Sequence, residues 1–100
     1  MAPALENVLG ILQDNEAALR LLGVSHASVF GSVARGQAHS TSDVDVLLDL
    51  DPDHPIGVFE YARIKLFVNE ILGGESDVVN RRTLKPLLRA SILRDAVNAF

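Results

Sequence analysis

The stretch that decides the fold of this chain runs from Phe30 to Leu50 and reads FGSVARGQAHSTSDVDVLLDL. Its second half alternates acidic and apolar side chains, which is typical of a strand with one face in a protein core. We therefore predict a strand over Asp43–Leu50, with Asp43 and Asp45 leaving the same face. Their Cα atoms should lie roughly 6.5 to 7 Å apart at the rise per residue of a strand.

The remaining periodicity predicts helices around a small sheet. Apolar side chains recur at helical spacing in three segments, and Gly23 and Gly73–Gly74 follow two of them as helix ends. The expected elements are a helix over Pro3–Leu22, a strand over Val24–Phe30, a short helix over Ser32–Arg35, a polar loop over Gln37–Ser42, a turn over Asp51–Pro55, a helix over Ile56–Leu72, a short strand over Asp77–Asn80 and a last helix over Leu84–Phe100. This order predicts an α/β (α+β) fold, a small mixed sheet of three or more strands flanked by helices. The connection between the last two strands is long enough for a parallel crossover.

The amino-acid composition argues against several classes of protein and of binding site. The chain has 100 residues and a net charge of -4, and no basic run is longer than Arg81-Arg82. A single domain over residues 1–100 is expected, with no direct binding of nucleic acid, because such binding normally relies on a basic face. There are no cysteines, which excludes disulfides and thiolate metal sites. With no signal-peptide or membrane-spanning pattern, a soluble cytoplasmic protein is expected.

The two aspartates have a chemical interpretation and a simpler alternative. Two nearby carboxylates repel each other and raise each other's proton affinity, and a divalent cation relieves that repulsion. Oxygen ligands suit Mg²⁺, which also takes contacts from phosphate oxygens. Val44, Val46 and Leu48 would anchor the opposite face in the core and hold the acids rigidly. The alternative is an exposed strand face that carries solubilising acids.

The Gly31-Ser32 pair, at the end of the preceding strand, suits an anion. Glycine allows a sharp turn and a close approach to its backbone N–H. Ser32 opens a short helix, where free N–H groups favour phosphate. Arg35 follows one helical turn later and could reach the same phosphate. The alternatives are an ordinary strand-to-helix turn and a solvated arginine.

Taken together, the motif resembles a known superfamily. Gly31-Ser32, ten further residues, Asp43, one residue and Asp45 match the signature G-S-x(ten)-D-x-D of the DNA polymerase beta-like nucleotidyltransferases. The residues around this signature, FGSVARGQAHSTSDVDVLL, resemble the minimal nucleotidyltransferase (MNT) branch, in which G-S-x-A-R-G-x-A precedes S-D-x-D. The resemblance covers essentially the whole chain and implies a polymerase-beta-like palm core.

The resemblance also implies a set of site residues. A third carboxylate belongs on a later strand, and the best match is Asp77 in GGESDVVN, with Glu75 as the rival acid and a strand-start cap as the alternative. Asp43, Asp45 and Asp77 would then be catalytic residues and ligands of Mg²⁺, with Asp77 as ligand or general base. ATP would be the substrate, held by Gly31, Ser32 and Arg35.

The family further implies an acceptor. Proteins that this chain resembles act as antitoxins of HEPN/MNT pairs and transfer AMP from ATP to a tyrosine of a HEPN-type ribonuclease toxin. Two alternatives stay open: an antitoxin that neutralises the toxin by binding alone, and AMP transfer to a small molecule. Apolar side chains on two sides of Ile56–Leu72 fit either a partner protein or a homo-oligomer.

Overall fold

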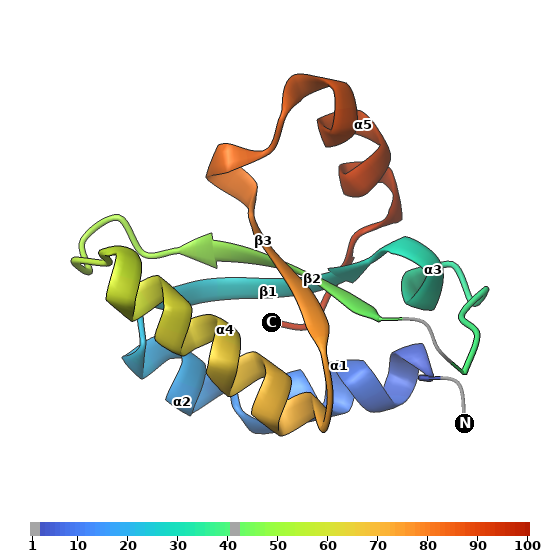
Figure 1. Cartoon of the computed structure of the whole chain (residues 1–100), viewed down its shortest axis with the longest axis horizontal. Coiled ribbons are helices and arrows are strands. Elements are labelled where there is room, and N and C mark those ends of the chain that lie inside the picture. Colours follow the sequence, from blue (N-terminus) through green and yellow to red (C-terminus); the bar gives the residue numbers. More distant parts are fainter. Residues whose placement is uncertain (1–2, 41–42) are drawn as a thin grey trace.

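The computed structural model describes residues 3–40 and 43–100, and Figure 1 shows helices on both sides of one sheet. In chain order the elements are α1 (Leu5–Asp14), α2 (Glu16–Leu21), β1 (Val24–Phe30), α3 (Gly31–Ala34), β2 (Val44–Leu50), α4 (Val58–Leu72), β3 (Ser76–Asn80), the 3-10 turn η1 (Arg81–Thr83), α5 (Pro86–Asp95) and β4 (Val97–Asn98).

The sheet is mixed, as the sequence predicts. Its strand order is β3-β2-β1-β4. β1 runs antiparallel to both β2 and β4, whereas β2 and β3 are parallel and joined by α4. The predicted α/β class and the parallel crossover are therefore confirmed.

The main core lies on one face of the sheet. In Figure 1, α1, α2 and α4 lie along this face and α5 rises from the other. β2 contributes Val44, Val46 and Leu48, because alternate side chains of a strand share a face. Leu47 points the opposite way and is still only 1% exposed, so the α5 face is partly covered as well. The complete core cluster comprises Val8, Leu12, Leu19, Val24, Ala27, Val29, Val33, Val44, Val46, Leu48, Ile64, Val68, Val78 and Ala99.

The N-terminal segment differs from the single helix expected over Pro3–Leu22. It forms two helices that meet at Asn15, whose φ of -106° and ψ of 14° are not helical. The Asn15 side-chain amide donates a hydrogen bond of 2.8 Å to the Ile11 carbonyl. Asparagine often competes with the helix by bonding to nearby backbone, which explains the break.

The C-terminal segment is the larger correction. The helix expected over Leu84–Phe100 spans only Pro86–Asp95, and Ala96 is already extended at φ -64° and ψ 127°. Residues Val97–Asn98 form β4 and pair with Ser28 and Val29 of β1. The edge of β1 offers unpaired backbone groups, and satisfying them outweighs one more helical turn.

Other helices and strands begin one or two residues away from their predicted positions. α3 begins at Gly31, one residue before the expected helix, and α4 begins at Val58, two residues after. Asp43 lies just before β2, which starts at Val44. The polar loop expected over Gln37–Ser42 includes Thr41 and Ser42, which lie outside the described residues.

Helix α4 has two apolar sides, of which only one is covered. Ile64 and Val68 are fully buried against the sheet, whereas Phe59 and Leu66 are 86% and 68% exposed. Large exposed apolar side chains on one helix mark a surface that is suited to a partner.

Substituting the centre of β2 tests the core. Leu48→Ala should lower the free energy of unfolding by about 2–5 kcal/mol, because it leaves a cavity at a fully buried position. Leu66→Ala, on the exposed side of α4, is the control and should change it by no more than about 0.5 kcal/mol. Urea unfolding measures both, and equal losses would contradict the core described here.

Candidate active site

Three neighbouring strands bring the predicted residues to one line across the sheet. Phe30, the last residue of β1, is the register partner of Asp45 on β2, and Asp45 is the register partner of Asp77 on β3. Gly31-Ser32 follows Phe30 directly. The glycine turn, one aspartate of the D-x-D pair and the third aspartate therefore lie side by side, although they are far apart in the sequence.

Gly31 sits against the carboxylate of Asp45. A Cβ at position 31 would lie 2.1 Å from the Asp45 Oδ2 atom, so the Asp45 carboxylate would have to move away from its present position. The φ of Gly31 is +75°, in the left-handed region that favours glycine. This position therefore needs glycine for two reasons, its backbone conformation and the space that Asp45 occupies.

Asp45 is held in a strained electrostatic environment. Partial burial raises the pKa of its carboxyl most, the carboxylates of Asp77 and Asp43 raise it further, and Arg35 opposes them. Desolvation and like charges both disfavour ionisation. The three aspartates are therefore close enough to repel one another, as the sequence predicts for the D-x-D pair.

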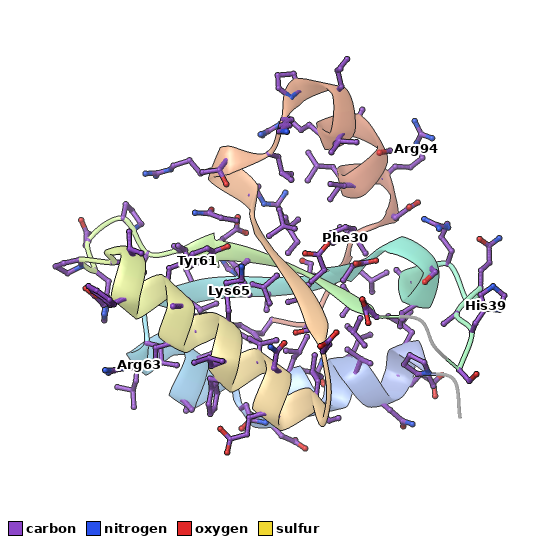
Figure 2. All side chains as sticks on the ribbon, viewed as in Figure 1. Phe30, His39, Tyr61, Arg63, Lys65 and Arg94 are labelled. Carbon is purple, nitrogen blue, oxygen red and sulfur yellow. The ribbon has the colours of Figure 1, made fainter. Side chains whose placement is uncertain are left out.

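Asp77 is exposed at the start of β3, on a strand end that α4 holds in place. The Asn69 side-chain oxygen accepts hydrogen bonds from the Ser76 backbone N–H, at 3.0 Å, and from the Ser76 hydroxyl. Asp77 also acts on Tyr61, a residue of α4. Burial is the larger cause of the raised pKa of Tyr61, and the Asp77 carboxylate raises it further. Figure 2 shows Tyr61 on α4 beside Lys65, whose Nζ lies 5.6 Å from the ring centroid.

Arg35 is already engaged within the protein. Its Nη1 is 2.6 Å from Asp95 Oδ2 and its Nε donates to Gln37 Oε1 at 3.1 Å. This ion pair ties α3, the helix that starts at Gly31, to the end of α5. The predicted phosphate contact of Arg35 would have to compete with Asp95 or to use the remaining N–H groups.

Asn69 and Asp95 are residues that sequence reasoning missed. An asparagine inside an apolar helix is a weak signal that its side chain has a specific partner. Asp95 gave no comparable signal, because its partner is 60 residues away in the sequence.

The carboxylates of Asp43, Asp45 and Asp77 are chemically suited to bind a hard cation. Carboxylate oxygens are the preferred ligands of Mg²⁺, and the mutual repulsion of these groups would be relieved by a positive charge between them. Within residues 3–40 and 43–100, no three carboxylate or imidazole groups already converge as a ligand set. Rotation of the exposed Asp43 and Asp77 side chains would be needed to complete one.

A model of the nucleotidyltransferase domain matches residues 6–98. The chain belongs to this family. This nucleotidyltransferase is 33% identical over 94 residues to protein adenylyltransferase MntA of Thermococcus cleftensis, a match that covers 93% of each chain. A solved minimal nucleotidyltransferase superposes with a TM-score of 0.77 at 34% identity and 95% coverage of both chains. The same fold occurs in a toxin–antitoxin crystal structure with AMP-PNP, at a TM-score of 0.69 and 16% identity, over 88% of this chain and 72% of that one.

The nucleotidyltransferase shows no sign of a membrane span in the part of the chain that is described. None of those helices is both long enough and apolar enough to cross a bilayer.

Substituting Gly31 tests its contact with Asp45. Gly36 has a similar φ of +71° with open space where a Cβ would lie, so Gly36→Ala isolates the backbone strain, about 1–2 kcal/mol of unfolding free energy. Gly31→Ala should lose more than this, because it also displaces the Asp45 carboxylate. Chemical denaturation of the two variants checks the difference, and equal losses would show that the contact is unimportant.

Neutralising Asp45 tests the cost of ionising this carboxyl, to which burial contributes most and the neighbouring acids contribute further. Because its pKa is raised, folded Asp45 binds a proton more tightly than the unfolded chain does, so its contribution to stability is lost as pH rises. Asp45→Asn should therefore be more stable than the native protein at neutral pH, and the gap should close in acid. Unfolding at several pH values measures this, with Glu70→Gln on α4 as the control for one lost charge. A gap that widens in acid would contradict the result.

Proposed function

We propose that this nucleotidyltransferase transfers AMP from ATP to a tyrosine hydroxyl of a HEPN-type ribonuclease toxin and acts as its antitoxin. The observation that carries the proposal is the alignment of the Gly31 turn, Asp45 and Asp77 across three strands. Membership of the family and the name of the Thermococcus relative, a protein adenylyltransferase, support it.

In the proposed reaction the chain's own groups position both reactants. Gly31, which has no side chain, lets the triphosphate approach the backbone N–H groups of α3, and Ser32 adds a hydroxyl. Asp43, Asp45 and Asp77 would hold Mg²⁺, which neutralises charge on the phosphates. Asp77 is exposed whereas Asp45 is partly buried, so Asp77 would face the acceptor and take the proton of the attacking hydroxyl. The tyrosine oxygen bonds to the α-phosphorus as the bond to the pyrophosphate leaving group breaks.

A protein acceptor fits the surface of the domain. Phe59 and Leu66 present large apolar groups on the outside of α4, where a partner could cover them. A chain with this fold is found in a toxin–antitoxin assembly solved with AMP-PNP, an analogue of ATP. A toxin that carries AMP at its RNA-cutting site would gain a bulky anion and exclude its substrate.

The test is transfer of AMP to the protein encoded next to this gene. Incubation with Mg-ATP should raise the neighbour's mass by one AMP unit. Asp45→Asn should reduce the rate by at least about a hundredfold, because it removes a carboxylate that would hold the charge-neutralising Mg²⁺. Asp53→Asn, in the exposed turn after β2, is the matched control and should keep the native rate. Intact-protein mass spectrometry measures both, and absence of any mass gain with native protein would overturn the proposal.

A second function, neutralisation by binding alone, is favoured by the exposed apolar side of α4. The double variant Asp43→Ala with Asp45→Ala keeps that surface and removes two of the acids. If it still protects cells from the toxin, masking is sufficient. Loss of protection with retained complex formation would establish that catalysis is required.

A further inference from the structure

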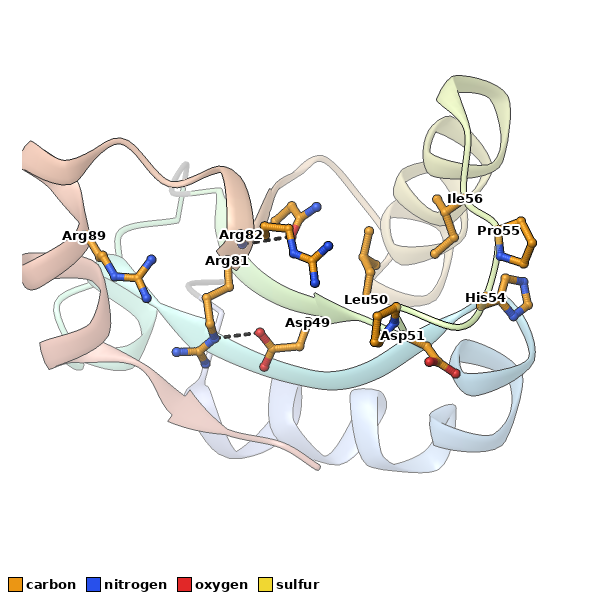
Figure 3. A pocket seen from close by; sticks show the side chains of 11 residues that line it. Asp49, Leu50, Asp51, His54, Pro55, Ile56, Arg81, Arg82 and Arg89 are labelled. Atoms are coloured by element: carbon orange, nitrogen blue, oxygen red, sulfur yellow. Dashed lines mark hydrogen bonds and ion pairs between the residues drawn. The ribbon is translucent and has the colours of Figure 1, made fainter.

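A polar pocket lies at the other end of β2 and β3 from the three aspartates. It has a volume of about 670 Å³, and its lining includes Arg81, Arg82 and Arg89. Figure 3 shows Arg89 on α5 at one side, the loop residues His54 and Pro55 at the other, and Arg81 between them, pointing toward Asp49. The chain has nine lysines and arginines and a net charge of -4, so three cations in one pocket are a marked concentration.

Among the described residues, two of the three guanidinium groups have no hydrogen-bond or ion-pair partner. Arg81 is paired with Asp49, with its Nε 2.6 Å from Asp49 Oδ1. No ion pair or hydrogen bond is found for the guanidinium groups of Arg82 and Arg89 within residues 3–40 and 43–100. Asp49 is paired with Arg81, and Asp51 also lines the pocket, so the three arginines exceed the lining carboxylates by one positive charge.

The pocket is aligned with the candidate active site. Asp45 and Asp49 are four residues apart on β2, so they share one face and lie about 13 Å apart along the strand. Leu47 lies between them on that face and is only 1% exposed, so an acceptor segment would pass over the residues that cover it. An extended polypeptide that places a hydroxyl beside Asp77 would reach the pocket with a residue about four positions away.

We propose that this pocket binds an acidic side chain of the acceptor polypeptide, about four residues from the modified hydroxyl residue. The inference rests on the proposed function and names what the site selects in its protein substrate. Guanidinium groups bind carboxylates through charge-assisted hydrogen bonds, often two at once. A continuous nucleic-acid strand is a poorer fit, because Asp51 also lines the pocket and the chain as a whole is acidic.

The test is binding of extended peptides, followed by fluorescence anisotropy. The first peptide carries a tyrosine with a glutamate four residues away, and the second carries glutamine in place of that glutamate. The native protein should bind the first about tenfold more tightly, the usual contribution of a hydrogen bond to a charged group. The double variant Arg82→Gln with Arg89→Gln should bind both peptides equally. Arg63→Gln, on α4 outside the pocket, is the matched control and should keep the preference.

Each outcome decides the inference. No preference in the native protein, or an undiminished preference in the double variant, would overturn it. So would a short single-stranded oligonucleotide that binds more tightly than the acidic peptide and loses that binding in the double variant. Asp45→Asn separates this inference from the proposed function: it should retain the peptide preference even if AMP transfer is never observed. Conversely, AMP transfer without any peptide preference would leave the proposed function standing and remove this one.

Discussion

The close approach of the Gly31 backbone to the Asp45 carboxylate is the constraint on which the site depends. A side chain at position 31 would occupy the place of Asp45 Oδ2, so the Asp45 carboxylate keeps its present position only with glycine there. Because Phe30 and Asp45 are register partners, this contact also fixes where α3 starts relative to the acids. The Gly31 turn and the Asp45 carboxylate are therefore placed side by side by one contact, which glycine permits without any shift of Asp45.

The same packing explains why the site is held under electrostatic strain. Val44 and Val46 bury their side chains in the core and prevent Asp45 from moving away from its neighbours. Partial burial and the nearby carboxylates then raise the Asp45 pKa, so the folded protein stores repulsion that a cation would relieve. Functional sites commonly contain such destabilising electrostatic interactions, and favourable interactions elsewhere in the fold offset them.

The polar face of β2 links two regions of opposite charge. The aspartates lie at one end and the arginine-lined pocket lies at the other, with Leu47 buried between them under the α5 side of the sheet. Phe59 and Leu66 lie exposed on α4, which packs against the opposite face of the sheet.

The local periodicity of the sequence was enough to predict the strands β1 to β3 and the covering helices, because alternation and glycine turns are properties of neighbouring residues. The G-S-x(ten)-D-x-D motif was recognised separately, by its resemblance to a known superfamily. Local periodicity failed at Asn15 and after Asp95, where a side-chain hydrogen bond and the open edge of β1 outweighed helical pattern. The sequence by itself determined which residue types a nucleotidyl-transfer site requires. Only the tertiary structure decided that Asp77 neighbours Asp45, that Asp95 holds Arg35 and that three arginines line one pocket, because strand register and packing join residues that no local pattern connects.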